Sequence, residues 1–136
     1  METLEAAFLT NPRFEDITEG NETQKLRLLD ELRVFSAVLN NFIHIPAGFE
    51  FEESIPSFLF SLARPVGESK RAACIHDWLY IHGSFTNPGG TFSITRPQAD
   101  AVYHEFLRAK GVSKTRSFFR WLGVRLGGWP HFNSSL

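Results

Sequence analysis

The chain places a histidine beside an aspartate, His76-Asp77, inside the run from Arg71 to Tyr80, whose other residues are mostly small, apolar or aromatic. Buried ionisable groups are costly unless they are paired. A histidine can act as a general base near neutral pH, and an aspartate can bind a metal ion or orient such a base. The pair therefore marks a candidate site, although the same residues could also cap or pair locally on a partly exposed helix.

Two helices are expected to position this pair. The first extends from residue 68 to about residue 82, and it places His76 and Tyr80 on one face because residues four apart share a face of a helix. The second begins with a Thr-x-x-Gln capping box at Thr95 and ends at Gly111, a typical left-handed end.

The second helix carries a further pair of candidate residues. Asp100 and His104 are four residues apart and share a face. If the two helices are antiparallel, Asp100 can lie opposite His76. A third helix is expected after Ser113, which can cap it.

The first half of the chain indicates strands. Residues 42–45 and 49–51 are bounded by turn residues and alternate as short strands do. Residues 25–39 fit a helical stripe as well as two short strands, so their pattern leaves both open. Residues 83–90 end in an Asn-Pro-Gly-Gly cluster, which indicates an open loop.

These elements predict an α+β fold. A small N-terminal antiparallel β layer is followed by about three helices, two of them antiparallel and carrying the candidate residues. We expect an N-terminal arm at residues 1–24, a single domain at residues 25–128 and a tail at residues 129–136.

Composition is that of a soluble globular domain. The chain has 136 residues, of which 43% are hydrophobic and 21% charged. Its single cysteine, Cys74, excludes an intramolecular disulfide. No apolar run reaches the roughly 18 to 20 residues of a membrane span. The start Met1–Glu5 is acidic where a secretory signal would be basic, so we expect synthesis in the cytoplasm without a signal peptide.

Charge is distributed unevenly along the chain. Residues 1–66 contain eleven acids and five bases, whereas residues 67–136 contain four acids and nine bases. No acid follows Glu105. The basic and aromatic C-terminal region could contact anionic lipid or an acidic protein partner, or it could be a solvated helix face. The six bases that follow Glu105 do not by themselves indicate nucleic-acid binding, because the sequence contains no recognisable nucleic-acid-binding module.

Four motifs follow one another along the chain: Pro46-Ala47-Gly48-Phe49, Ser54-Ile55-Pro56, Ala73 to Tyr80, and Arg96-Pro97-Gln98-Ala99-Asp100. Together they resemble an uncharacterised domain family of tailed bacteriophages and their prophages. The resemblance covers roughly residues 25–128 and implies strands, not a helix, for residues 25–39. It also implies a phage protein, with other virion proteins of the tail or baseplate as partners.

The pattern His76-Asp77-x-x-Tyr80, followed by Asp100 on a later helix, also resembles the core of secretory phospholipase A₂. The resemblance implies that His76 is the general base that activates a water molecule. It implies that Asp77 binds Ca²⁺. It further implies that Asp100 orients the histidine and that Tyr80 supports Asp100 by a hydrogen bond.

Three hypotheses about function follow. The first is a phospholipase A₂-like hydrolase of lipid or cell-envelope esters. The second is a non-enzymatic component of a phage tail or baseplate, in which His76, Asp77, Tyr80 and Asp100 form a buried hydrogen-bond network. The third, ranked last, is a metal-dependent phosphohydrolase that uses His76, Asp77, Asp100 and His104.

Overall fold

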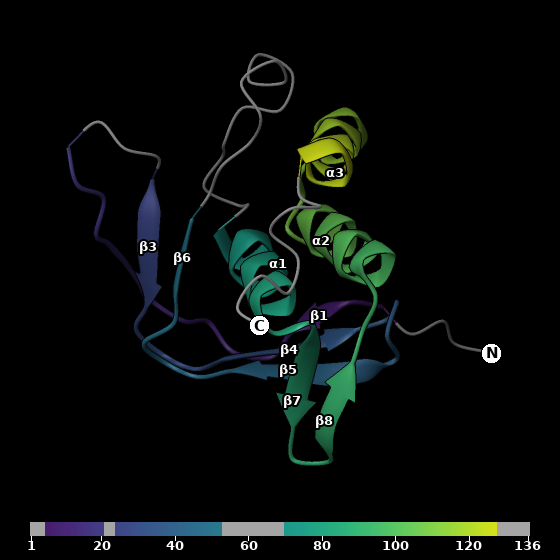
Figure 1. The fold of residues 1–136 in the computed structure, drawn as a ribbon, viewed down its shortest axis with the longest axis horizontal. Helices are drawn as coiled ribbons and strands as arrows, with labels where there is room; N and C mark the ends of the chain where they lie inside the picture. The colour runs from purple at the N-terminus through teal and green to yellow at the C-terminus, as the bar shows by residue number, and fades with distance from the viewer. Residues whose placement is uncertain (1–4, 21–23, 53–69, 128–136) are drawn as a thin grey trace.

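The computed structural model describes residues 5–20, 24–52 and 70–127, and it is α+β as the sequence predicts. Within these residues, antiparallel strands are followed by three helices; the first two lie over the strands, and the third packs on the second, away from the strands (Figure 1). The strands are β1 (Ala7–Phe8), β2 (Phe14–Asp16), β3 (Lys25–Leu28), β4 (Leu32–Ser36), β5 (Asn41–Ile45), β6 (Glu50–Glu52), β7 (Ser84–Asn87) and β8 (Gly90–Ser93). The helices are α1 (Lys70–His82), α2 (Arg96–Ala109) and α3 (Lys114–Gly127).

The first six strands form two small sheets of three strands each. One has the order β1-β4-β5 and the other β2-β3-β6, and every pairing is antiparallel. The turn at Pro46–Phe49 carries the chain from the first sheet to the second, and Gly48 has the left-handed φ of 97° that favours glycine. Residues 25–39 are thus strands, which confirms the implication of the family resemblance.

The segment expected to be an arm contributes to both sheets. Phe8 in β1 packs against Phe106 in α2, with ring centroids 5.2 Å apart. Phe14 in β2 packs edge-on against Phe51 in β6 at 5.7 Å. These aromatic contacts join the polar, acidic N-terminal segment to the core, and alternation in so short a segment is too weak to reveal them.

The segment between α1 and α2 differs from its prediction as an open loop. It is a hairpin, in which Ser84 pairs with Ser93 and Phe85 with Phe92. Its two phenylalanine rings stack at 5.2 Å. The Asn-Pro-Gly-Gly cluster is therefore the tight turn of a hairpin rather than part of a longer loop.

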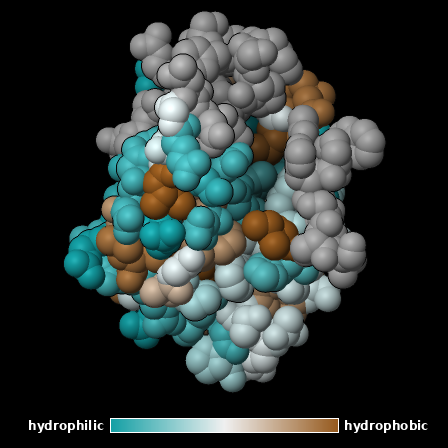
Figure 2. Space-filling model, turned by 60° about the vertical axis from the view of Figure 1, so that its left-hand side comes forward, coloured by the Kyte–Doolittle hydropathy of each residue, from teal (hydrophilic) through white to brown (hydrophobic). Residues whose placement is uncertain are grey.

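One hydrophobic core joins the sheets to the helices. The β4–β5 sheet buries one face, and α1 and α2 pack on it with their own apolar residues. The face shown in Figure 2 is mainly hydrophilic. Its hydrophobic residues form separate patches. No helix among the described residues combines the length and the apolar character needed to cross a bilayer. The main core residues are Leu32, Val34, Ile43, Ile45, Ile75, Leu79, Val102 and Phe106.

Candidate functional site

Helix α1 is buried on more than one side, so two of its polar residues, His76 and Tyr80, lie in the interior of the protein. The buried residues of α1 include Ala72, Ala73, Cys74 and Ile75. Because the side chains of Ala72, Ala73 and Cys74 are small, α1 can pack close to the neighbouring elements. His76, the next residue, is only 7% exposed. A histidine at this depth needs a polar partner, and α2 provides one.

His76 and Asp100 meet across the interface between α1 and α2, which confirms their expected proximity. Nε2 of His76 lies 2.9 Å from Oδ1 of Asp100, whose residue surface is fully buried. Contacts run in opposite order along the two helices, since Tyr80 contacts Arg96 whereas His76 contacts Asp100. The two helices are therefore antiparallel, as predicted.

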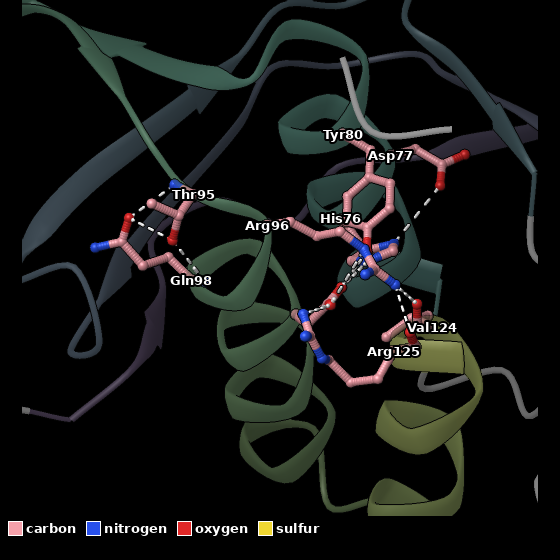
Figure 3. Close-up of polar contacts among 9 residues, drawn as sticks. His76, Asp77, Tyr80, Thr95, Arg96, Gln98, Val124 and Arg125 are labelled. Atoms are coloured by element: carbon pink, nitrogen blue, oxygen red, sulfur yellow. Dashed lines mark hydrogen bonds and ion pairs between the residues drawn. The ribbon is translucent and has the colours of Figure 1, made fainter. Parts of the chain in front are cut away.

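Three further groups surround the Asp100 carboxylate (Figure 3). The Tyr80 hydroxyl donates to Oδ1 at 2.5 Å, which matches the support expected from the phospholipase resemblance. Nη1 of Arg125, on α3, donates to Oδ2 at 2.9 Å. Nε of Arg96 lies 3.9 Å from Oδ2 and donates to the Tyr80 hydroxyl at 3.0 Å. Side chains from all three helices thus meet at one carboxylate.

Electrostatics keep Asp100 ionised. Burial alone would raise the pKa of Asp100, but the hydrogen bonds from His76 and Tyr80, with the Arg125 contact, bring that pKa below its ordinary value. Burial also raises the pKa of Tyr80, and the neighbouring Asp100 charge raises it further, so the phenol stays protonated and donates.

The ionised Asp100 determines which ring nitrogen of His76 carries hydrogen. A carboxylate only accepts hydrogen bonds, so Nε2–H of His76 must be the donor in this contact. In the neutral ring, Nδ1 then has the lone pair. A carboxylate behind an imidazole fixes the tautomer in the same way in known hydrolytic sites.

Asp77 lies on the Nδ1 side of the ring. Its Oδ1 is 4.0 Å from Nδ1 of His76, and its Oδ2 accepts a hydrogen bond from the backbone amide of Glu52 at 2.9 Å. This hydrogen bond connects α1 to β6. Asp77 therefore lies beside the ring atom that could take a proton, and its role as a metal ligand stays a prediction.

Asp77 would be one of several ligands that a calcium ion needs. Ca²⁺ takes about six to eight oxygen ligands. Within residues 5–20, 24–52 and 70–127, no three His, Cys, Asp or Glu residues come together as a metal-binding group. The four-residue metal centre of the phosphohydrolase hypothesis, which includes His104, is thus not assembled there. His104 is half-buried, and burial and the nearby Arg108 lower its pKa.

Sequence reasoning missed the arginines of this site. Arg96 is four residues before Asp100, a spacing that could have indicated the contact. Arg125 is 25 residues away and gives no local signal. Arg120, expected in a basic surface, has no exposed area. Of the C-terminal bases, Lys114 and Arg116 do lie on the surface of α3, where Phe118 is 49% exposed.

A family model described as "Protein of unknown function (DUF1353)" matches residues 26–124, which is most of the chain. The chain belongs to the DUF1353 family. This confirms the expected membership of an uncharacterised domain family, while the phage origin and the phospholipase likeness stay predictions. The DUF1353 match contains His76, Asp77, Tyr80 and Asp100, and it ends one residue before Arg125. The Ser54-Ile55-Pro56 motif and the expected tail at 129–136 lie outside the described residues. The chain has no significant match among the curated proteins or the solved structures.

Proposed function

We propose that the protein is an ester hydrolase in which His76 acts as general base and Asp100 orients it. The observation that carries this proposal is the orientation of the His76 ring. Nε2 contacts the Asp100 carboxylate at 2.9 Å, which leaves Nδ1 as the basic atom on the side of Asp77. This arrangement matches the roles that the phospholipase A₂ resemblance implies.

The proposed reaction needs water and an ester. Nδ1 of His76 takes a proton from a water molecule while the water oxygen attacks the ester carbonyl carbon. The resulting imidazolium is stabilised by the Asp100 carboxylate through Nε2–H. When the tetrahedral intermediate collapses, the imidazolium returns the proton to the leaving alkoxide, so that the products are an acid and an alcohol.

Calcium enters the proposal as a cofactor at Asp77, in agreement with the resemblance. When bound, a hard cation would polarise the ester carbonyl. The described residues offer it the Asp77 carboxylate, of which Oδ2 already accepts a backbone hydrogen bond. The proton transfers derived above involve only this chain and water.

The proposed substrates are lipid or cell-envelope esters. We further propose that the protein is encoded by a tailed bacteriophage or prophage, is made in the host cytoplasm and joins other tail or baseplate proteins in the virion. The four motifs support this origin. Exposed Lys114 and Phe118, four residues apart on one face of α3, support contact with a lipid surface, because protein surfaces that bind lipid combine basic and aromatic residues.

The test is fatty-acid release from anionic and neutral liposomes by the purified protein, with Ca²⁺ or with a chelator. We expect release by the native protein and a loss of about 10²–10⁴-fold in His76→Asn, as is typical when a general base is removed. His82→Asn is the matched control, because His82 is exposed at the end of the same helix and does not contact Asp100. It should keep the native rate.

Two outcomes would contradict the hydrolase proposal. One is the absence of release under every condition, and the other is an equal rate in His76→Asn and the native protein. Calcium is tested separately by Asp77→Asn. If Ca²⁺ binds at Asp77, this variant should lose the calcium-dependent part of the rate.

A non-enzymatic tail or baseplate component is the second candidate. It is favoured by the complete burial of Asp100 and by Arg125, which occupies the second carboxylate oxygen. A purely structural network predicts that His76→Asn destabilises the fold while no ester is ever hydrolysed. The liposome assay and an unfolding curve on the same variant therefore separate the two candidates.

A further inference from the structure

Arg120 is a fully buried arginine with unfinished hydrogen bonding. It lies on α3 with no exposed area, and its Nη1 donates to the Tyr103 hydroxyl of α2 at 3.1 Å. Its Nε and Nη2 atoms are buried and have no hydrogen-bond partner within the part of the chain that the structure describes. Only one of its three guanidinium nitrogens is therefore satisfied there.

Such an arginine cannot escape its charge. Guanidinium groups stay protonated in proteins, so the group cannot become neutral on burial as a lysine can. Taking an unpaired charge out of water is strongly unfavourable. Buried arginines are therefore normally paired with a carboxylate or phosphate, often through two parallel hydrogen bonds.

The buried carboxylate of Asp100 does not provide this partner. Asp100 forms ion pairs with Arg125 and Arg96 on one oxygen and contacts His76 and Tyr80 with the other. Among the residues that the structure describes, Arg120 forms no ion pair. The helical interior thus contains more positive charge than its buried carboxylate can balance.

We propose that Arg120 binds an oxyanion, a phosphate or carboxylate group, in the interface between α2 and α3. Nε and Nη2 supply the donors, and the Tyr103 hydroxyl fixes the orientation of the guanidinium through Nη1. An oxyanion accepts from two neighbouring guanidinium nitrogens, which is the pairing that Arg120 lacks.

The position of this site connects it to the candidate catalytic pair. The ring of Tyr103 packs against the ring of His76, with centroids 4.7 Å apart. Tyr103 therefore contacts both Arg120 and His76, and it links the anion site to the base. That this anion belongs to the substrate or the product rests on the proposed function, whereas the anion site itself does not.

Binding requires a local opening, because Arg120 has no exposed area. Proteins open locally at a free energy below that of global unfolding, so a closed site can still be reached. An anion that fills the site also stabilises the closed form by mass action.

The first experiment is calorimetric titration of the native protein with inorganic phosphate, in a zwitterionic buffer at constant ionic strength with chloride as the reference anion. We expect saturable binding of phosphate. Arg120→Met, which keeps the length of the side chain and removes the charge, should bind at least about tenfold more weakly. Arg116→Met is the matched control on the exposed side of the same helix and should bind as the native protein does.

Spectroscopy of the native protein keeps the test independent of any variant's folding. The ¹⁵Nε–¹H signal of Arg120 should shift on addition of phosphate, while that of exposed Arg116 should not. Absence of saturable phosphate binding, an Arg120 signal that does not move, or native affinity in Arg120→Met would each overturn the proposal.

Further probes identify the source of the anion. Hexanoate represents a fatty-acid product, and a short-chain phosphatidylglycerol below its micellar concentration represents a lipid headgroup. The phospholipid competing with phosphate would assign the site to the headgroup, and competition by hexanoate would assign it to the product. His76→Asn should bind phosphate normally, because the anion site does not depend on the base. Phosphate binding by a native protein that releases no fatty acid under any condition would reject the hydrolase alone.

Discussion

Nε2 of His76 lies 2.9 Å from Oδ1 of Asp100, and this contact joins two antiparallel helices through residues that are 24 positions apart. The carboxylate is completely buried, yet it is ionised because donors from α1 and α3 surround it. The same contact stabilises the helical layer and fixes the hydrogen on the histidine ring. Stability and proposed chemistry therefore depend on one carboxylate.

Replacing this carboxylate should destabilise the fold. In Asp100→Asn, Arg125 loses its buried counter-ion while its guanidinium stays charged. We expect the free energy of unfolding to fall by about 3–5 kcal/mol, as is typical when one partner of a buried pair is removed. Urea denaturation followed by circular dichroism measures the loss.

Asp30→Asn is the control for this prediction. Asp30 also pairs with an arginine, Arg13, but both side chains are largely exposed. Its removal should shift the urea midpoint far less, since exposed pairs contribute little. Equal shifts in the two variants would show that the buried network adds no special stability.

Glu105 should make stability depend on pH. It accepts hydrogen bonds from the Ser36 hydroxyl at 2.7 Å and from the Ala37 amide at 2.5 Å, which ties α2 to the turn after β4. Burial raises the pKa of Glu105 more than these bonds lower it. A folded-state pKa above the unfolded one gives stability that is present at pH values below the ordinary pKa and is lost as the pH rises through the raised pKa.

The variant Glu105→Gln removes this titration. We expect the Tm of the native protein minus the Tm of Glu105→Gln to fall as the pH is raised from about 4, near the ordinary glutamate pKa, to neutrality. Thermal unfolding in a series of buffers measures the difference. A difference that is constant or rises with pH would contradict the prediction.

Arg96 should fasten the end of α3 to the site. Its Nε donates to the Tyr80 hydroxyl at 3.0 Å, while its Nη2 donates to the carbonyls of Val124 at 2.8 Å and Arg125 at 2.5 Å. We expect Arg96→Met to lose about 1.5–3 kcal/mol of stability, in line with hydrogen bonds from a charged group. Amide hydrogen exchange in the last turn of α3 should become faster.

Two comparison variants define this role. Arg96→Lys should not restore slow exchange, because a single ammonium cannot reproduce the fork geometry that reaches the hydroxyl and the carbonyls together. Arg33→Met, at an exposed position of β4, should leave α3 exchange unchanged. Native exchange rates in Arg96→Met would exclude the fastening role.

Local signals predicted the helices well. The capping box between Thr95 and Gln98 is present, and α2 begins at Arg96, directly after the N-cap residue Thr95. Gly111 has the left-handed φ of 86° expected after a helix, and Ser113 accepts a hydrogen bond from the Arg116 amide at the start of α3. These signals are readable because the residues that make the contact are three or four positions apart.

Long-range relationships were only partly readable. The pattern of residues 25–39 fits helix and strand alike, and it is the pairing of β3 with β2 and β6 that makes Lys25–Leu28 a strand. Phe85 and Phe92 stack across a hairpin whose strands are only four residues long. Burial of Arg120 gave no sequence signal, because arginine is usually a surface residue.

The most direct measurement is the tautomer of His76, read from long-range ¹H–¹⁵N NMR spectra at a pH where the ring is neutral. The structure requires a hydrogen on Nε2, donated to Asp100, and a lone pair on Nδ1. The ring of exposed His82 in the same spectrum serves as the reference. A single Nε2–H tautomer for His76 is the predicted result. A hydrogen on Nδ1, or two tautomers in similar amounts, would contradict the assignment of His76 as a base oriented by Asp100.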